Sequence, residues 1–477
     1  MLNYFMMFTT HDFRMKIKML FVTFFISSYV FGARGDLISA EILATKSLIN
    51  AQTYIDNELA QIVSDMFSIE PAQYGYWLYK ITYETIDQFG DSHIATGVVS
   101  YPRVDWPEIP DQAFPMISYQ HGTVVEKSSV TSVNGEWILS AILTTSGYVY
   151  AEPDYLGLGD SEGRHPYQLK EPYGTACVDL FRAIRQYSEQ NDQFTLNDQL
   201  FLAGYSEGGY ATMALHNIIE RDYSNEFQIT YSFPMAGAYS MSGVMVDVML
   251  DMQPYGEPFY FPYVLFAYID AYTELDSPES YLLPQYHNLY DMFDGFHASS
   301  EINASMPNIP ITIMKPDSID SFESNQNHPL RLALKENDLW NWMPIAPIHI
   351  FHGIGDELVP VENSEMAYEQ FINNGSQNIQ LELIPESFGG HQDVAPWALF
   401  GAYQIAKDYQ MINELGDMNQ DGGYDILDIV KIANLILLGP NSEYASYSFW
   451  AADLNMDESI NIQDIVILID MILYNNF

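Results

Sequence analysis

The stretch 200–209, Leu-Phe-Leu-Ala-Gly-Tyr-Ser-Glu-Gly-Gly, changes within a few residues from an apolar strand pattern to the start of a helical one. The strand pattern ends at Gly204, and the helical pattern runs from Gly209 to Ile219. Ser206 stands between them, two residues from Gly204 and two from Gly208. A tight strand-to-helix turn needs such glycines because it leaves no room for side chains beside the serine. The stretch therefore predicts that the turn pushes the Ser206 hydroxyl out of a sheet, where it can act as a nucleophile.

A serine hydroxyl becomes a good nucleophile when a base removes its proton and a carboxylate orients that base. In proteins with this kind of turn, the acid and then the histidine follow the serine along the chain. Asp356 lies in a glycine-containing loop directly after the apolar strand pattern 348–352, with Glu357 as the adjacent alternative. His391 follows two glycines after the last predicted strand, and among the 11 histidines it alone combines this order with such a loop. We expect Ser206 to be the nucleophile, His391 the base and Asp356 the acid.

Backbone N–H groups near the serine are candidates for holding an oxyanion. The N–H of Glu207 starts the helix after the serine and is free to donate. The segment 120–123, Gln-His-Gly-Thr, follows another predicted strand, where a second donor is expected. Gly122 would let the backbone approach a substrate, and Thr123 offers its N–H or its hydroxyl. We expect the oxyanion donors at Glu207 and in the region of Gly122 and Thr123.

Short apolar strands alternate with helical segments along most of the chain. This alternation predicts an α/β fold, in which a mostly parallel sheet is covered by helices on both faces. The expected elements are a helix at Leu43–Val63, a hairpin of Tyr76–Ile86 and His93–Tyr101, and the strands Phe114–Tyr119, Tyr148–Glu152, Leu200–Gly204, Ile229–Met235, Ile348–His352 and Ile379–Ile384. The pattern stops at about 236–346, which is too long for a simple connection and predicts an inserted helical subdomain. Its aromatic segment 255–272 fits either packed core or an apolar substrate wall.

Composition and charge narrow the functional classes. The 477 residues are 48% hydrophobic, which is enough for a large buried core, and they carry a net charge of -45. So acidic a protein repels nucleic-acid phosphates, and we expect no nucleic-acid partner. Cys177 is the single cysteine, which excludes an intramolecular disulfide framework and a cysteine-based metal site.

The N-terminus has the pattern of a targeting segment. Arg14, Lys16 and Lys18 precede an apolar run that ends at Phe31 and is followed by small residues. This pattern is typical of a secretory signal peptide, which we place at residues 1–33, and it predicts a secreted protein. No other stretch is long and apolar enough to span a membrane.

Acidic and amide residues recur at alternate positions in the C-terminal tail, and its two halves repeat from Asp417 to Asp453, a spacing of 36 residues. Ca²⁺ takes six to eight oxygen ligands, and oxygens at positions 1, 3, 5, 7, 9 and 12 of a loop wrap around one ion. The expected ligands are Asp417, Asn419, Asp421, Gly423 through its carbonyl, Asp425 and Asp428, then Asp453, Asn455, Asp457, Ser459, Asn461 and Asp464. An apolar helical pattern follows each loop, at 429–438 and 465–473, which predicts a small all-α calcium-binding domain.

The motifs together resemble a known superfamily. Gln-His-Gly-Thr at 120–123, Pro-Asp-Tyr-Leu-Gly-Leu-Gly at 153–159 and Gly-Tyr-Ser-Glu-Gly-Gly at 204–209 resemble the α/β hydrolases, and among them the secretory lipases of the fungal lipase A type. The resemblance spans about residues 70–412. The chain departs from the pattern at Leu156, where the superfamily often has arginine, and in lacking the family's cysteines.

This resemblance implies an α/β-hydrolase domain at 34–412 whose helical cap is the insert at about 236–346. It also implies hydrolysis of carboxylic esters without a cofactor, with Ser206, Asp356 and His391 matching the family's triad. The substrate would be a small or polymer-linked ester.

The tail, residues 415–477, is similar to a type I dockerin, including the aspartate at position 12 where an EF-hand has glutamate. The resemblance implies bound Ca²⁺ and a cohesin-like protein partner. Clostridial dockerins usually have Ser-Thr at the two recognition positions of each loop, where this chain has Ile426-Leu427 and Ile462-Gln463. Such a tail associates the chain with polysaccharide-linked esters.

Two other functions remain open from the sequence. The same triad cleaves amides, so a serine aminopeptidase or prolyl-type peptidase is an alternative, in which Glu207, Glu152 or Glu162 would bind a substrate amine. The other alternative is a dockerin-borne binding protein with an inactive hydrolase fold. Complete triad chemistry in the right chain order favours an enzyme.

Overall fold

The structure is a computed structural model that describes residues 32–62, 69–103, 113–135, 137–191, 193–412, 415–419, 423–438, 449, 451–455, 457 and 459–474. The predicted signal peptide therefore lies almost wholly outside the described residues. Along these residues the strands are β1 (Leu37–Lys46), β2 (Gly75–Ile86), β3 (Ser92–Arg103), β4 (Ala113–Gln120), β5 (Val149–Pro153), β6 (Thr195–Tyr205), β7 (Ile229–Met235), β8 (Ile348–Gly353) and β9 (Ile379–Ile384).

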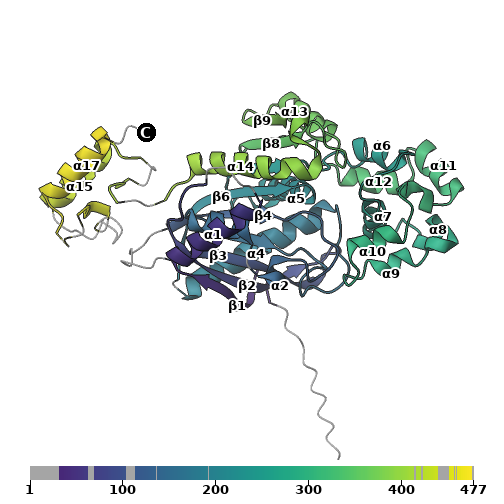
Figure 1. Cartoon of the computed structure of the whole chain (residues 1–477), viewed down its shortest axis with the longest axis horizontal. Coiled ribbons are helices and arrows are strands. Elements are labelled where there is room, and N and C mark those ends of the chain that lie inside the picture. Colours follow the sequence, from purple (N-terminus) through teal and green to yellow (C-terminus); the bar gives the residue numbers. More distant parts are fainter. Residues whose placement is uncertain are drawn as a thin grey trace, which may run out of the picture. The chain divides into compact units, whose positions relative to one another are not determined.

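These strands form one nine-stranded sheet with the order β1-β2-β3-β5-β4-β6-β7-β8-β9 (Figure 1). The first four strands in that order pair antiparallel, and every pair from β5 onward is parallel. The carboxyl ends of the parallel strands therefore meet at one edge of the sheet. The predicted mostly parallel α/β sheet is confirmed.

Helices cover both faces of the sheet because the central strands are apolar on both sides. In β6, Phe201 and Ala203 pack with α1 (Leu48–Ile62), α3 (Ile138–Thr145) and α14 (His391–Tyr409). The alternate residues Leu200 and Leu202 pack on the other face with α4 (Lys170–Asn191) and α5 (Glu207–Ile218). Successive strand residues point to opposite faces, which explains why these strands are continuously hydrophobic in sequence.

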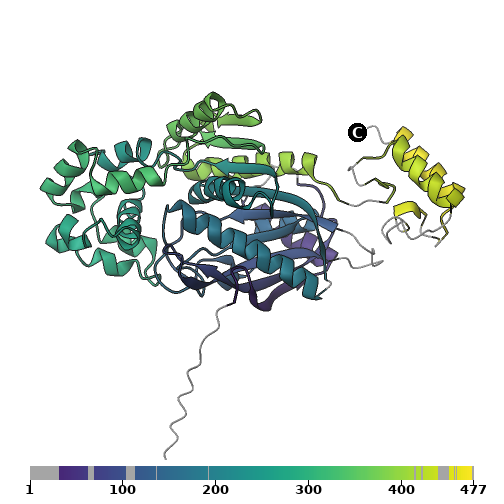
Figure 2. The ribbon, with the colours of Figure 1, turned by 180° about the vertical axis from the view of Figure 1, so that it is seen from behind.

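The segment between β7 and β8 is helical, as predicted. Its elements, grouped together in Figures 1 and 2, are α6 (Val244–Leu250), α7 (Tyr260–Ala271), α8 (Pro278–Tyr281), η2 (Pro284–Tyr286), α9 (Leu289–Met292), α10 (Ser299–Ala304), η3 (Pro310–Ile313), α11 (Pro316–Ser324) and α12 (Pro329–Glu336). In the aromatic segment, Phe261, Tyr263 and Tyr268 are buried in the cap core. Tyr255 and Tyr260 are half-buried and line a pocket, so the segment serves as both core and wall.

The remaining described helices are α2 (Thr131–Asn134), η1 (Ile219–Tyr223), α13 (Glu362–Asn373), η4 (Glu386–Phe388), α15 (Ile426–Leu438) and α17 (Ile462–Tyr474). The last two belong to the tail, where Ile432, Leu435, Ala452 and Leu468 form a small core of their own. Both tail helices start three residues before the predicted apolar patterns.

The start of one predicted helix is wrong, and the sequence did not predict the edge strand before it. The expected helix at Leu43–Val63 begins only at Leu48, and residues up to Lys46 form the edge strand β1. β1 pairs antiparallel with β2, with Ala44 opposite Leu78. The helical spacing of apolar residues that predicted this element starts at Leu48 and lies within α1. The sequence missed β1 because its pairing with β2, rather than a local pattern, makes this edge segment a strand.

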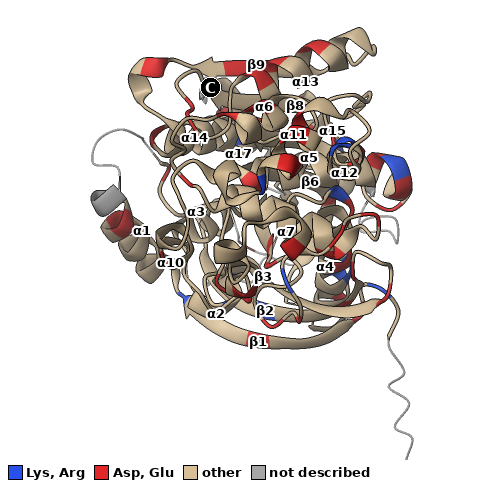
Figure 3. Ribbon diagram, turned by 90° about the vertical axis from the view of Figure 1, so that its right-hand side faces the viewer, with Lys and Arg blue, Asp and Glu red and all other residues tan. Residues whose placement is uncertain are grey.

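Figure 3 shows that acidic residues outnumber basic ones over the visible ribbon, as the net charge requires. Among the described residues, no helix is both long enough and apolar enough to cross a membrane.

The close packing of α5 against β7 at Gly209 can be tested by substitution. A Cβ on Gly209 would collide with the backbone carbonyl of Met235, and both segments are buried. Alanine ordinarily stabilises a helix relative to glycine, but here we expect Gly209→Ala to lower the unfolding free energy by about 1–3 kcal/mol. Thermal unfolding measures the effect. Gly122→Ala is the control, because its Cβ would meet only the Tyr205 carbonyl at 3.5 Å. An unchanged or higher Tm for Gly209→Ala would contradict this packing.

Candidate active site

Ser206 occupies a strained turn between β6 and α5. Its φ and ψ are 64° and −122°, a backbone conformation that non-glycine residues rarely adopt, and its N–H donates to the Met235 carbonyl at 2.9 Å. A Cβ on Gly204 would strike the backbone of Gly208 across the turn, and a Cβ on Gly208 would strike the carbonyl of Gln120 in β4. Both glycines predicted for this turn are therefore needed because a side chain would not fit at either position. The residue with the strained backbone is Ser206 itself.

The side chains of Ser206, His391 and Asp356 form one hydrogen-bonded chain. The Ser206 Oγ lies 2.8 Å from His391 Nε2, and His391 Nδ1 lies 2.6 Å from Asp356 Oδ2. A carboxylate only accepts hydrogen bonds, so Nδ1 carries the proton and the neutral Nε2 is free to accept the serine proton. Serine lies at the end of β6, aspartate after β8 and histidine after β9, so the parallel strands bring together residues that are up to 185 positions apart.

The surroundings of Asp356 keep it ionised. Burial by itself would raise its pKa, but hydrogen bonds from His352 and His391 outweigh burial and hold the pKa below its ordinary value. The N–H groups of Leu358 and Val359 also donate to its Oδ1, at 3.0 and 2.8 Å. Asp356 can therefore stabilise a positive charge on the imidazole without taking up the proton.

Glu357, the alternative acid, has a different place. Its Oε2 accepts the backbone N–H of His391 at 3.0 Å, and the residue is exposed. Sequence reasoning set His352 aside as a strand residue, but its Nε2 lies 3.3 Å from Asp356 Oδ2. Nothing in the local sequence marks that contact, since it arises from the turn after β8.

The two groups of candidate oxyanion donors lie on either side of Ser206. Glu207 is the first residue of α5, where backbone N–H groups have no acceptor within the helix. Gly122 and Thr123 follow β4 and line the same cavity as Ser206 and His391. Among the described residues, the N–H groups of Glu207 and Thr123 donate to no protein group. The Thr123 hydroxyl lies 3.0 Å from the Tyr167 hydroxyl and is thus engaged.

The side chain of Glu207 is buried away from the oxyanion position. Its Oε1 lies 2.9 Å from His165 Nε2 and accepts from the Tyr173 hydroxyl at 2.7 Å. Both members of the His165–Glu207 pair are almost fully buried. The sequence did not single out His165 or Tyr173 as site residues.

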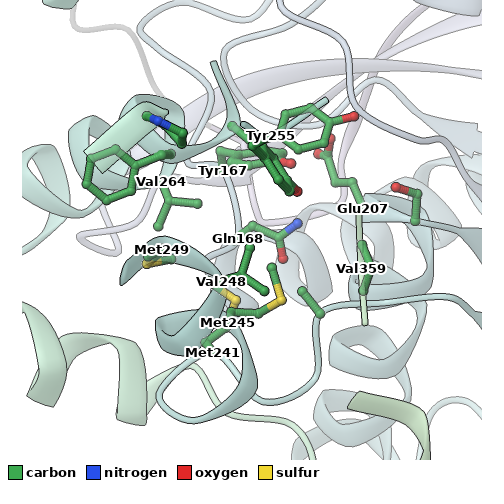
Figure 4. A pocket seen from close by; sticks show the side chains of 15 residues that line it. Tyr167, Gln168, Glu207, Met241, Met245, Val248, Met249, Tyr255, Val264 and Val359 are labelled. Atoms are coloured by element: carbon green, nitrogen blue, oxygen red, sulfur yellow. The ribbon is translucent and has the colours of Figure 1, made fainter. Parts of the chain in front are cut away.

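Two cavities open at Ser206. The first lies under the cap, has a volume of about 50 Å³ and is lined largely by methionine, valine and aromatic side chains (Figure 4). The second has a volume of about 490 Å³, and its lining includes His391, Thr131, Asn134 and Glu152. The nucleophile thus faces a narrow apolar space on one side and a wider space with a mixed polar and apolar lining on the other.

All the predicted calcium ligands belong to the tail, and all of them except Asp421 are among the described residues. In the first loop Asp428 accepts the N–H groups of Met418 and Asn419, and in the second Asp464 accepts that of Asn455. Within the described part of the chain, no group of three or more histidine, cysteine or acidic side chains is arranged to hold a metal ion. The predicted ligand atoms are all oxygens, which Ca²⁺ prefers. The aspartate at position 12 of each loop accepts backbone N–H groups of its own loop in the same way. The residues therefore fit this ion.

A sheet of this order, with a serine turn after its central strand and a helical insert before β8, defines the α/β-hydrolase class. A model of the prolyl oligopeptidase family matches residues 137–228, which include the serine turn. A model of the type I dockerin domain matches residues 415–473. The chain therefore has a domain with the α/β-hydrolase fold and a C-terminal type I dockerin domain.

Solved structures with the same fold include hydrolases from several organisms. A putative hydrolase from Legionella pneumophila is 26% identical, with a TM-score of 0.69 over 78% of this chain and 98% of that one. The rice cell wall degrading esterase LipA from Xanthomonas oryzae is 24% identical, with a TM-score of 0.69 over 80% and 99%. Candida antarctica lipase A is 16% identical, with a TM-score of 0.53 over 76% and 78%. No curated protein sequence matches the chain.

Proposed function

We propose that the protein is a secreted hydrolase of carboxylic esters that works through an acyl-enzyme on Ser206. The observation that carries this proposal is the buried hydrogen-bonded chain from Ser206 through His391 to Asp356, which starts at a strained turn. Strain at a functional side chain persists only where the surrounding structure enforces it. A decayed site in an inactive binding protein has no need of such an arrangement.

The geometry supports acyl transfer in two halves. His391 Nε2 takes the Ser206 proton as Oγ attacks the ester carbonyl, and the resulting oxyanion is held by the N–H groups of Glu207 and the Gly122–Thr123 region. The bond to the alcohol breaks as His391 gives its proton to the leaving oxygen. A water then loses a proton to His391 and attacks the acyl-enzyme. His391 returns that proton to Ser206 Oγ as the bond to the acyl group breaks, which releases the acid and restores the serine. Asp356 holds the imidazole and stabilises its positive charge.

Several observations favour esters over peptides. The cap pocket is apolar, as an acyl chain requires, and two structural neighbours are described as an esterase and a lipase. Of the three carboxylates considered for binding a substrate amine, Glu207 is paired with His165, and Glu162 is exposed and lines neither cavity at Ser206. Glu152 lines the larger cavity and is the one that a substrate amine could reach. The match to the prolyl oligopeptidase family keeps peptidase activity as the second candidate.

The dockerin domain supports the remaining parts of the proposal. We infer that residues 1–33 are removed on secretion and that the two tail loops bind Ca²⁺. The bound domain would then present its helices to a cohesin-like partner and place the hydrolase domain near polysaccharide-linked esters. The residues 34–412 and 415–477 are the domain limits we propose, with the cap at about 236–346.

Replacing the residues of the hydrogen-bonded chain tests the mechanism. We expect the full mature protein to hydrolyse p-nitrophenyl butanoate, and Ser206→Ala to abolish this activity because no acyl-enzyme forms. Asp356→Asn should lower kcat by about 10³–10⁴, because the imidazole loses its working tautomer. Steady-state kinetics on folded variants measures both effects.

Glu357→Gln and Glu362→Gln serve as comparisons for Asp356→Asn. Glu357 contacts only the His391 backbone, so its loss should be far smaller, and Glu362 is exposed in the first turn of α13. An equal loss in Glu357→Gln would move the acid role to that residue. Turnover of aminoacyl p-nitroanilides without ester turnover would establish the peptidase instead.

Calcium binding is tested by calorimetry on the full chain. We expect two ions per chain, and Asp464→Asn should remove one of them because it takes a carboxylate from the second loop. Asp470→Asn is the matched control, an exposed aspartate in the following helix α17. Binding of no calcium, or the same loss in both variants, would contradict the ligand assignment.

A further inference from the structure

The position of His391 indicates which cavity takes the leaving group. In acyl transfer the imidazole must give its proton to the departing oxygen, so the leaving group has to lie on the imidazole's side of the serine. His391 lines the 490 Å³ cavity and is not part of the lining of the cap pocket. The cap pocket therefore takes the acyl group, and the larger cavity takes the alcohol.

The leaving-group cavity contains a carboxyl group that the reaction itself does not use. Glu152 lies near the end of β5 and is 2% exposed. Its Oε1 accepts from the Thr131 hydroxyl at 3.0 Å and its Oε2 from the Tyr150 hydroxyl at 2.6 Å. Each carboxylate oxygen has more than one lone pair, so both can accept a further hydrogen bond. A buried carboxyl in a cavity beside a nucleophile is costly to fold and points to a ligand.

The rest of this cavity is suited to a polyhydroxylated molecule. Trp137 and Tyr119 form an aromatic wall, with ring centroids 5.0 Å apart. Hydroxyl and amide side chains, namely Ser129, Thr131, Asn134 and Gln392, share the lining with the aliphatic side chains of Val124, Val130, Ala395 and Leu399. Aromatic faces cover apolar C–H surface, while the mixed donors and acceptors match hydroxyl groups.

We propose that this cavity is the subsite for a polyhydroxylated leaving alcohol of sugar size, with Glu152 accepting a hydrogen bond from one of its hydroxyls. The inference rests on the proposed ester hydrolysis. It names the alcohol half of the substrate and makes Glu152 a specificity-determining residue.

A cationic alcohol fits the cavity less well. A permanent cation needs acceptors and aromatic faces only, whereas this lining also offers several donors. Burial raises the pKa of Glu152 from its ordinary value to about 7, so the carboxyl is partly uncharged at neutral pH. In its uncharged form the carboxyl can donate one hydrogen bond to a hydroxyl group as well as accept one, but it loses its attraction for a cation.

The test compares esters with the same acyl group and different alcohols. Methyl 6-O-butanoyl-glucoside and cyclohexylmethyl butanoate share a six-membered ring on a primary alcohol, and only the glucoside has hydroxyl groups, a ring oxygen and a methoxy group. We expect kcat/KM of the full mature protein to favour the glucoside ester by about tenfold or more, because a site built for hydroxyls leaves its polar groups unpaired with the analogue. Glu152→Gln should remove most of that preference, and Glu162→Gln, which alters an exposed carboxylate outside the cavity, should not.

A second variant and a binding measurement cover the case in which Glu152→Gln does not fold. Asn134 is exposed and lines the cavity, so Asn134→Ala should fold and lower the preference several-fold. Methyl β-glucoside should also compete with p-nitrophenyl butanoate in the unaltered protein. Saturation-transfer NMR should detect this glucoside on Ser206→Ala protein, which needs no turnover.

Three outcomes would overturn the inference. Equal kcat/KM for the two esters, together with no glucoside binding, would show that the cavity does not recognise hydroxyl groups. A preference for butanoylcholine that Glu152→Gln removes would assign the carboxylate to a cation. If kcat/KM for glycerol monobutanoate exceeded that for cyclohexylmethyl butanoate as much as the glucoside ester does, the cavity would accept any polyol. The assignment of a sugar-sized alcohol would then be wrong. Failure of the proposed hydrolysis appears separately, as absence of p-nitrophenyl butanoate turnover, and glucoside binding then decides the inference by itself.

Discussion

The turn between β6 and α5 has no space for side chains at Gly204, Gly208 and Gly209, and the active-site region depends on that constraint. With side chains there, α5 could not approach β4 and β7 closely enough for Ser206 to stand clear of the sheet. The close packing gives Ser206 its positive φ and leaves the Glu207 N–H at the free end of a helix. The strain at one residue is thus maintained by the packing of three neighbouring segments.

Parallel strand order then assembles the other groups around this turn. Loops after β4, β8 and β9 supply the Gly122–Thr123 region, Asp356 and His391 at the same sheet edge. The chemistry of these loops divides the surroundings of Ser206 in two. The cap contributes an apolar pocket, whereas β5 and α2 contribute polar groups, among them Glu152, and the loop before α3 contributes the aromatic ring of Trp137. An ester with an apolar acyl group and a hydroxylated alcohol matches this division.

The sequence predicted the regular parts of this arrangement and missed parts that depend on three-dimensional contacts. Eight of the nine strands were predicted from apolar or alternating patterns, whereas the edge strand β1 was missed. Ser206, His391 and Asp356 stand out through chain order and flanking glycines. His352 beside Asp356, and Glu152 in the leaving-group cavity, have no such local signature, because folding alone brings them to the site. The limits of the calcium loops remain predictions, since Asp421 lies outside the described residues.

The most direct test of the account is covalent trapping of the nucleophile. The full mature protein is treated with a fluorophosphonate ester, and peptide mass spectrometry locates the adduct. The account predicts one adduct per chain, on Ser206, with labelling slowed strongly in His391→Ala because Oγ then has no base. Labelling of another residue, or none in folded protein that hydrolyses esters, would contradict the assignment of Ser206 as the nucleophile.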